Sequence, residues 1–193
     1  MRTVTITRKT KETDIVLSLN LDGMGKADIN TGVGFFDHML TALAVHSGVD
    51  LSVICKGDLE VDCHHTVEDV GIVLGQAFLQ AIGDRSGIAR YGHFMLPMDE
   101  ALAMAAIDIS GRAYLVFDAE FKSANIGAMD TQMVEEFWRA FAMNAAVTLH
   151  LKLLYGSNDH HKVEAIFKAA AHAVKLAIVV QKEKVVLSTK GCL

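Results

Sequence analysis

The chain has little proline, little cysteine and no strong excess of either charge. It contains one proline, Pro97, and three cysteines in 193 residues, and the cysteines show no CxxC spacing. This cysteine usage argues against a disulfide framework and favours a reducing compartment. The net charge is −5, from 18 basic and 23 acidic residues, which gives no basic surface for nucleic acid. We therefore expect no nucleic-acid partner.

Long apolar runs are also missing. The longest, residues 165–180, is interrupted by Lys168, His172 and Lys175, so it falls short of the roughly 18 to 20 apolar residues that span a bilayer. The polar N-terminal residues form no signal-peptide core, so we expect a cytoplasmic protein with no membrane partner. The composition is nevertheless 51% hydrophobic with a mean hydropathy of +0.30. Apolar surface in such excess favours subunit contacts, and we expect a homo-oligomer.

Two parts of the chain share one order of predicted elements. Hydrophobic periodicity in the first part predicts strands at 14–21 and 49–55 and helices at 34–47 and 64–82. The same reading in the second part predicts strands at 102–109, 114–120 and 147–153 and helices at 133–146 and 160–180. Such repetition indicates an internal duplication. We predict an α/β (α+β) fold and a single domain, residues 1–193, made of two pseudo-repeats, about 1–93 and 94–193.

The strongest chemical signal is a histidine doublet followed three residues later by glutamate, which occurs once in each part. Neutral imidazole and carboxylate together bind first-row divalent metals such as manganese, iron or zinc. On a helix the first histidine and the glutamate share a face, whereas the second histidine points about 100° away. We expect that second histidine to reach a second ion, which another subunit could complete. The two motifs are His64-His65-Thr66-Val67-Glu68 and His160-His161-Lys162-Val163-Glu164.

A further ligand comes from the first helix of each part. Aligning Val49 with Val147 gives an offset of 98 residues, which carries His38 onto Glu136. Grouping by half then predicts two ligand sets. A surface or helix-capping role is the alternative for an isolated doublet, but its repetition favours metal. The two predicted sets are His38, His64, His65 and Glu68, and Glu136, His160, His161 and Glu164.

Other residues near the motifs have simpler roles. Asp62 and Asp159, directly before the doublets, are predicted to cap the two helices. The remaining histidines have no repeated counterpart, so structural roles are expected for His46, His93, His150 and His172.

Several longer motifs resemble one enzyme family along the whole chain. They are Phe35-Phe36-Asp37-His38-Met39-Leu40, Asp62-x-His64-His65-Thr66-x-Glu68-Asp69, Met98-Asp99-Glu100-Ala101-Leu102, Asp108-x-Ser110-Gly111-Arg112, Asp159-His160-His161-Lys162-x-Glu164 and Ser188-Thr189-Lys190-Gly191. Together they resemble imidazoleglycerol-phosphate dehydratase. The resemblance implies duplicated βαβ halves like domain 2 of ribosomal protein S5, with helices packed between sheets. It also implies a dimanganese centre, with other divalent metals as alternatives, and a cubic homo-oligomer of twenty-four subunits with interfacial sites.

The chain departs from this family pattern at two points. Members often carry histidine where this chain has Glu136, and a carboxylate can ligate the same metal. The tail reads Ser-Thr-Lys-Gly where the family commonly has Ser-Ser-Lys-Gly, which keeps the hydroxyl.

The resemblance also implies residue roles. Glu12 is the candidate for proton transfer or hydroxyl binding, and Glu68 or Glu164 could serve as a base besides holding metal. The implied ligands of a phosphorylated small-molecule substrate are Glu12, Arg90, Arg112, Lys168, Ser188, Thr189 and Lys190. From residue chemistry alone, Glu12, Arg90 and Lys168 could equally be solvated charges, and the tail could be a frayed terminus.

The implied reaction is the dehydration of imidazole glycerol phosphate to imidazole acetol phosphate in histidine biosynthesis. Removing its carbon-bound proton is difficult because no neighbouring carbonyl accepts the charge. The imidazole ring is the available electron sink, and two divalent ions on its nitrogens would stabilise the imidazolate form. Loss of hydroxyl through a diazafulvene-like intermediate, proton loss to an enol and tautomerisation would then follow. Two other functions share the residues: a dimetal phosphate-ester hydrolase and a metal-storing or structural cage.

Overall fold

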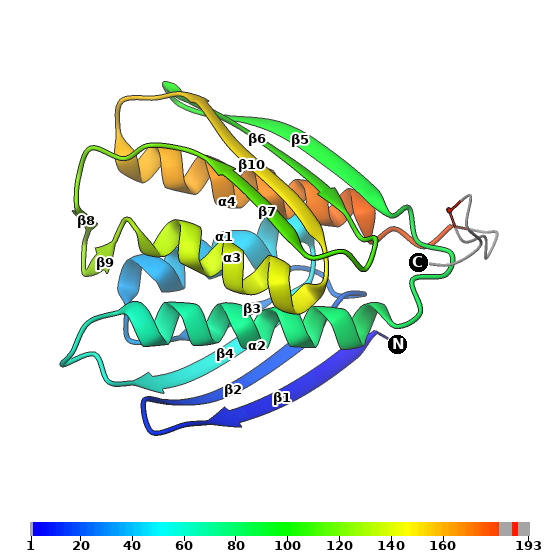
Figure 1. Cartoon of the computed structure of the whole chain (residues 1–193), viewed down its shortest axis with the longest axis horizontal. Coiled ribbons are helices and arrows are strands. Elements are labelled where there is room, and N and C mark those ends of the chain that lie inside the picture. The colour runs from blue at the N-terminus through cyan, green and yellow to red at the C-terminus, as the bar shows by residue number, and fades with distance from the viewer. Residues whose placement is uncertain (1, 182–186, 189–193) are drawn as a thin grey trace.

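Two four-stranded sheets enclose a layer of four helices in the computed structural model, which describes residues 2–181 and 187–188 (Figure 1). The first half contains β1 (Thr3–Lys9), β2 (Thr13–Asn20), β3 (Ala27–Asn30), α1 (Gly34–Ser47), β4 (Asp50–Gly57) and α2 (His64–Ile82). The second half contains β5 (Tyr91–Met98), β6 (Ala101–Asp108), β7 (Tyr114–Asp118), β8 (Asn125–Ile126), β9 (Met129–Asp130), α3 (Met133–Ala145), β10 (Thr148–Tyr155) and α4 (Asp159–Ala177).

The two sheets have the same topology. Their strand orders are β1-β2-β4-β3 and β5-β6-β10-β7, with an antiparallel hairpin followed by a parallel pair in each. A helix joins each parallel pair, so both halves contain a βαβ unit. The predicted duplicated α/β fold, with helices between sheets, is confirmed.

The sequence prediction missed three of the four edge strands of these sheets and found the fourth, β7, at 114–120. The strands β1, β3 and β5 each lie at a sheet edge, where one side is unpaired and the residues are partly exposed. The polar alternation of β1 and the shortness of β3 gave no strong hydrophobic signal. Pro97 within β5 is tolerated because an edge strand does not need every backbone N–H. The last helix was predicted too long, since α4 ends at Ala177.

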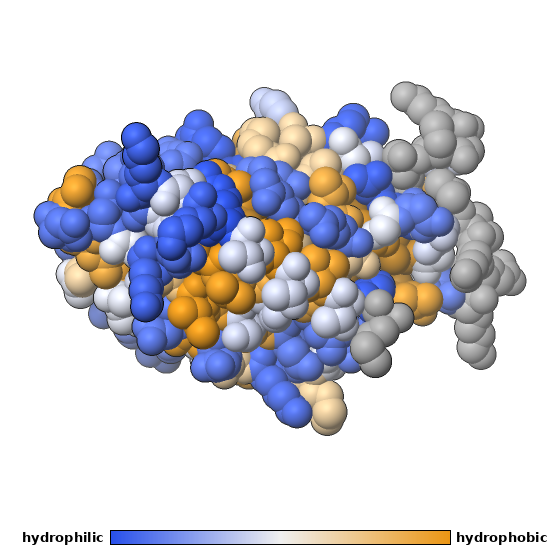
Figure 2. All heavy atoms as spheres, turned by 90° about the horizontal axis from the view of Figure 1, so that it is seen from below, coloured by the Kyte–Doolittle hydropathy of each residue, from blue (hydrophilic) through white to orange (hydrophobic). Residues whose placement is uncertain are grey.

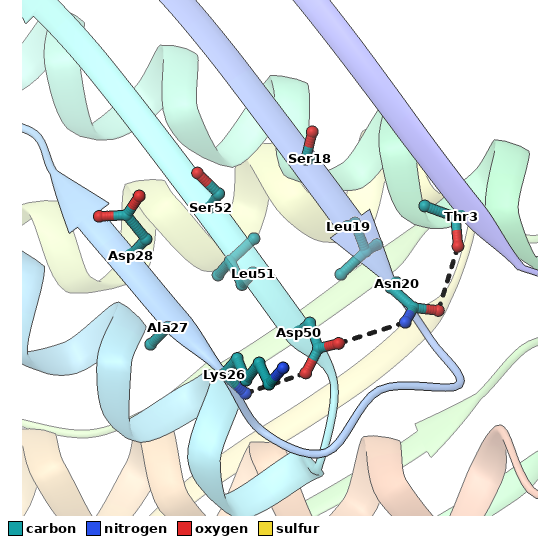
Figure 3. A pocket seen from close by; sticks show the side chains of 10 residues that line it. All are labelled: Thr3, Ser18, Leu19, Asn20, Lys26, Ala27, Asp28, Asp50, Leu51 and Ser52. Carbon is teal, nitrogen blue, oxygen red and sulfur yellow. Dashed lines mark hydrogen bonds between the residues drawn. The ribbon is translucent and has the colours of Figure 1, made fainter.

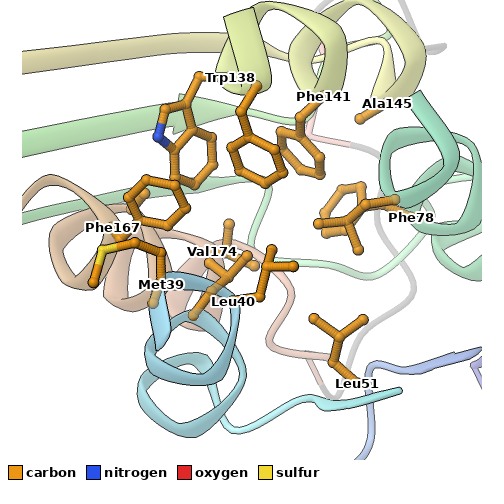
Figure 4. Close-up of a cluster of buried hydrophobic side chains, with 14 of the residues drawn as sticks. Met39, Leu40, Leu51, Phe78, Trp138, Phe141, Ala145, Phe167 and Val174 are labelled. Carbon is orange, nitrogen blue, oxygen red and sulfur yellow. The ribbon is translucent and has the colours of Figure 1, made fainter. Parts of the chain in front are cut away.

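Small residues bring α4 close to the second sheet. The inward positions of β6 are Ala103, Ala105 and Ile107, all buried. A Cβ added at Gly92 in β5 would lie 1.9 Å from the carbonyl oxygen of Ala173 in α4. Backbone therefore packs almost directly on backbone here, and only glycine fits. The aromatic residues fill the space between the helices instead, as Figure 4 shows for Phe78, Trp138, Phe141 and Phe167.

The helix N-termini place both histidine doublets at one end of the molecule. In Figure 1 the helices α2 and α4 begin on the left, whereas β1 begins and α4 ends on the right. Asn158 caps α4, since its side chain accepts the backbone N–H of His160 at 2.9 Å and of His161 at 3.3 Å. The prediction that Asp159 caps this helix was wrong.

Asp159 is buried and has a different partner. Its carboxylate pairs with the buried amine of Lys162 at 2.7 Å and accepts the N–H of Lys122 and Ser123. In α2 the N-cap residue is Cys63, although Asp62 does accept the N–H of His64 at 2.7 Å.

The outer faces of the sheets expose apolar side chains. Val16 and Ile54 are register partners on the first sheet, and both remain more than two-fifths exposed. Figure 2 views the molecule from this side and shows hydrophobic surface between hydrophilic side chains. On the second sheet the exposed large side chains include Tyr91, Met95, Tyr114 and Val116. Among the described residues, no helix is both long and apolar enough to cross a membrane.

Candidate metal centre

Three predicted ligands converge between α1 and α4. The His38 Nε2 atom lies 3.5 Å from Glu164 Oε2, and His160 Nε2 lies 3.3 Å from the same oxygen. The donor atoms of the three residues all lie within 4.8 Å of one another. Two imidazole nitrogens and a carboxylate oxygen are a donor set that suits first-row divalent metals.

The carboxylate at the centre of this group is buried. Burial alone would raise the pKa of Glu164, but the Lys168 amine at 2.6 Å and the neighbouring His38 lower the pKa overall. The group is therefore held as an anion. Lys168, predicted to bind phosphate, lies against this carboxylate, two turns along α4 from His160.

The two ligand sets do not follow the two halves of the chain. The grouping of His38 with His64 was wrong, because α1 packs along α4 and brings His38 to the doublet of the second half. The helix α3 likewise packs along α2. As a result, Glu136 and His64 line one pocket of about 270 Å³, together with Asp62, Cys63, Asp130, Gln132 and Met133.

The glutamate of this second cluster, Glu68, is more exposed than Glu164 in the first. His64 Nε2 lies 3.7 Å from Glu68 Oε2, and both side chains are more than two-fifths exposed. The Glu136 carboxylate lies 3.6 Å from Arg139 Nε. Metal ligation by the residues of both clusters remains a prediction.

The second histidine of each doublet is held by a carboxylate that the sequence prediction missed. His65 Nδ1 lies 2.9 Å from Asp58 Oδ2, and His161 Nδ1 lies 2.7 Å from Glu100 Oε2. These hydrogen bonds raise the pKa of both imidazoles. With Nδ1 donating to a carboxylate, Nε2 is left with its lone pair available, which is the usual arrangement of a metal-binding histidine.

The Asp58 and Glu100 roles were hard to find from motifs, since neither residue belongs to a doublet. The available signals were position and, for Glu100, its place in the motif Met98-Asp99-Glu100-Ala101-Leu102. Glu100 occupies the turn between β5 and β6 that corresponds to the Glu12 turn between β1 and β2, at an offset of 88 residues.

Glu12 lies beside the first doublet. Its Oε1 atom is 3.8 Å from His65 Nε2, and its side chain is about half exposed. The backbone of the turn is fixed by Asp58, whose N–H donates to the Glu12 carbonyl oxygen at 3.1 Å. The carboxylate is thus near a candidate metal ligand and open to a small molecule.

The predicted phosphate-binding arginines lie at the opposite end of the molecule. Arg90 is buried and makes a bidentate contact with Asp108 at 2.7 and 3.1 Å, while the exposed Arg112 reaches the same carboxylate at 3.4 Å. The backbone N–H of Arg90 also donates to the carbonyl oxygen of Ala177 at the end of α4. Residues 160 and 177 are separated by about 25 Å along a helix that rises 1.5 Å per residue.

The residue before the predicted tail contacts one of these arginines. Arg90 Nη1 donates to the carbonyl oxygen of Leu187, the residue before Ser188. The other two predicted tail ligands, Thr189 and Lys190, lie outside the described residues.

A separate shallow pocket of about 190 Å³ lies on the first sheet, at the far end of β4 from Asp58 (Figure 3). Its acidic group, Asp50, already accepts the N–H groups of Met24 and Lys26 and the amide of Asn20. These bonds hold the turn before β3 and give Asp50 a structural role.

These observations define a class of protein: an internally duplicated α/β chain with a candidate imidazole–carboxylate metal centre. Comparison with known proteins identifies the family. A family model described as imidazoleglycerol-phosphate dehydratase matches residues 31–174. The chain is 59% identical over 191 residues to the imidazoleglycerol-phosphate dehydratase of Acetivibrio thermocellus, with 97% of each chain covered. It is 57% identical over 193 residues to that of Methanosarcina barkeri, with both chains fully covered.

Solved structures agree with this assignment. The crystal structure of imidazoleglycerol-phosphate dehydratase from Staphylococcus aureus matches 93% of this chain and 99% of its own, with 42% identity and a TM-score of 0.85. The crystal structure of the enzyme from Pyrococcus furiosus, in complex with (S)-C348, matches 97% of this chain and 100% of its own, with 37% identity and a TM-score of 0.83. The chain belongs to the imidazoleglycerol-phosphate dehydratase family, as its motifs predicted, and is a hydro-lyase of histidine biosynthesis.

Proposed function

We propose that the chain dehydrates imidazole glycerol phosphate to imidazole acetol phosphate with two divalent metal ions, manganese by preference, at each active site. The observation that carries the proposal is the convergence of His38, His160 and Glu164. The donor set fits such an ion, and the carboxylate-held Nδ1 atoms of His65 and His161 leave Nε2 available at both doublets. The residues that would hold the ions are His38, His64, His65, Glu68, Glu136, His160, His161 and Glu164.

Bound ions would act as Lewis acids that stabilise the imidazolate form of the substrate ring. The other tasks fall to protein groups. Glu12 binds a substrate hydroxyl or transfers the side-chain proton, since its carboxylate is exposed beside His65. Lys168 keeps Glu164 ionised and supplies positive charge for the phosphate. Glu68 and Glu164 are secondary candidates for the base.

The experiment on the metal uses enzyme stripped by a chelator. Dehydration should disappear with the metal and return with Mn²⁺, and full turnover in the stripped enzyme would remove the metal from the mechanism. The product also separates this activity from hydrolysis, because dehydration keeps the phosphate on the product. A structural cage would give no water loss from the substrate at all.

We further propose that each active site uses residues from more than one chain. The arginines Arg90 and Arg112 lie about 25 Å from the His160 end of α4, a distance that a small phosphorylated molecule does not span. A second copy of the chain can bring its arginines to the metal end of the first. The exposed apolar residues on both sheets support a homo-oligomer, and the family resemblance favours twenty-four subunits.

Mixed oligomers test this arrangement. The His160→Ala chain is expected to be inactive alone, and the Arg112→Ala chain is expected to keep about a tenth of the wild-type kcat/KM or less, because each lacks one part of the site. Co-expressed in equal amounts, they should recover about a quarter of wild-type activity, since random mixing gives that share of sites with both parts intact. No recovery in mixed oligomers of normal size would show that both parts come from one chain.

The tail completes the proposed phosphate site. Ser188, Thr189 and Lys190 follow Leu187, which contacts Arg90. Truncation after Leu187 should raise KM strongly, and an unchanged KM would remove the tail from substrate binding. We regard both halves as one catalytic domain, residues 1–193, and place the enzyme in the cytoplasm because its cysteine usage suits a reducing compartment.

A further inference from the structure

A buried polar group lies directly behind the β1–β2 turn. The Asp69 carboxylate accepts the hydroxyl of the buried Thr13 at 2.5 Å and forms an ion pair with Arg8. Asp69 follows Glu68 in α2, while Arg8 and Thr13 lie on the two strands of the hairpin that carries Glu12. We infer that Asp69 is a positioning residue, which fixes this hairpin so that the Glu12 carboxylate meets the substrate. This inference rests on the proposed role of Glu12.

A chain of hydrogen bonds runs from Asp69 to the backbone of Glu12. The hydroxyl groups of Thr13 and Thr10 form a hydrogen bond, with 3.3 Å between the two oxygens. The Thr10 hydroxyl in turn accepts the N–H of Glu12 at 3.1 Å and of Thr13 at 2.9 Å. The turn is therefore held through its backbone and from its buried side.

The second half of the chain supplies an internal comparison. Strand registers place Arg8 and Thr13 in correspondence with Leu96 and Ala101, and the doublets place Asp69 in correspondence with Ala165. All three counterparts are apolar and buried. These three positions of the second half thus pack without a polar side chain, so the architecture itself does not require Arg8, Thr13 and Asp69 to be polar.

The two turns differ in how their glutamates are used. Glu100 accepts hydrogen bonds from the backbone N–H groups of Ser157 and Asn158, at 3.1 and 2.7 Å, and from the Ser157 hydroxyl. Its other carboxylate oxygen is hydrogen-bonded to His161 Nδ1. Among the described residues, the Glu12 carboxylate accepts no hydrogen bond, and the ionisable group within 4 Å of it is His65, whose Nε2 atom is 3.8 Å away. Glu100 anchors its own turn, whereas Glu12 is left free.

Asp69, Arg8 and Thr13 explain how the turn that carries Glu12 stays ordered although the Glu12 carboxylate makes no hydrogen bond to the described residues. The Asp69 side chain of this ion pair is 9% exposed and that of Arg8 is 31% exposed. A largely buried ion pair is often no better for stability than apolar residues of similar volume, so stability alone gives little reason for it here. Fixing a catalytic group from a second layer of residues does give a reason, because a displacement of about 1 Å can cost on the order of 100-fold in rate.

The test installs the second-half residues in the first half. The triple variant Arg8→Leu, Thr13→Ala and Asp69→Ala should fold, as the second half does. Its kcat and kcat/KM should fall together by about 10- to 100-fold, which is the signature of an interaction lost in the transition state. The stabilisation by Mn²⁺ should stay at the wild-type value. A folded triple variant with wild-type kcat would overturn the inference.

Single variants cover the case in which the triple variant does not fold. Thr13→Val removes only the hydroxyl and should lower kcat, whereas Thr13→Ser keeps the hydroxyl and should restore it. Equal activity of these two variants would contradict the inference. Asp50→Asn is the matched control, because Asp50 also holds a turn of the first sheet but lies at the far end of β4 (Figure 3). Its kcat should remain normal.

The Glu12→Gln background separates this inference from the proposed function. Wild-type turnover of Glu12→Gln would refute the catalytic role of Glu12 itself. If Glu12→Gln is impaired, adding Thr13→Val should cost nothing further, because both changes remove the same function. An additional loss equal to that of Thr13→Val alone would show a merely structural role and reject the positioning of Glu12.

Discussion

Replacing Glu164 with glutamine should separate metal binding from folding. The glutamine amide oxygen can still accept a hydrogen bond from Lys168, which now lies 2.6 Å from the carboxylate, so the packing around α4 should survive. What disappears is the negative charge between the His38 and His160 nitrogens, at 3.5 and 3.3 Å. Metal affinity should therefore fall much more than stability.

The expected size follows from binding linkage. At a Mn²⁺ concentration of 100 times Kd, binding adds about 2.7 kcal/mol to the stability of the wild type. For a chain of this length about 1 kcal/mol shifts Tm by about 2–4 °C, which gives an increase of roughly 5–11 °C. Even an outer-shell substitution raises a metal Kd by about 10- to 100-fold. At the same Mn²⁺ concentration, Glu164→Gln should then gain only about 0.4–1.4 kcal/mol, or roughly 1–6 °C.

Thermal unfolding with and without Mn²⁺ measures this difference. Asp118→Asn is the control, because Asp118 forms an exposed ion pair with Lys152 and should leave the metal response unchanged. A Glu164→Gln variant that gains as much Tm from Mn²⁺ as the wild type would refute the metal role of this carboxylate.

Three other substitutions test separate parts of the structure. Glu100→Gln should lower the pKa of His161, because the Glu100 hydrogen bond raises it. The stability that this pair adds is present at acid pH and is lost as the pH rises through the raised pKa, so the variant should be destabilised mainly in acid. Its Mn²⁺ binding, measured by calorimetry against pH, should begin at lower pH than that of the wild type. Arg112→Ala should raise KM about tenfold or more at unchanged Tm. Arg90→Ala should also lower the free energy of unfolding by about 3 kcal/mol, because it removes the bidentate partner of the half-buried Asp108. Equal Tm values for the two variants would contradict the structural role of Arg90. Gly92→Ala should lower the free energy of unfolding, measured in denaturant, by about 3 kcal/mol because its new Cβ clashes with Ala173. Gly34→Ala should be harmless, because its Cβ meets none of the described residues within 4 Å.

Much of this protein could be predicted from the sequence. The four helices and the duplication were found because buried helix faces repeat apolar residues at a regular spacing, and both halves keep the same order. The doublets were found because two copies of one imidazole–carboxylate pattern are hard to explain by chance. The motifs also gave the family, which the relatives and solved structures confirm.

Only the tertiary structure decided which residues meet. The sequence places His38 in the same half as His64, but α1 packs on α4, and His38 therefore meets His160 and Glu164. Helix pairing depends on the complementary surfaces of elements far apart in the chain, and a local period contains no information about that choice. The supporting carboxylates were hidden for the same reason, since Asp58, Glu100 and Asp69 acquire their roles through contacts made across a turn or between a helix and a hairpin.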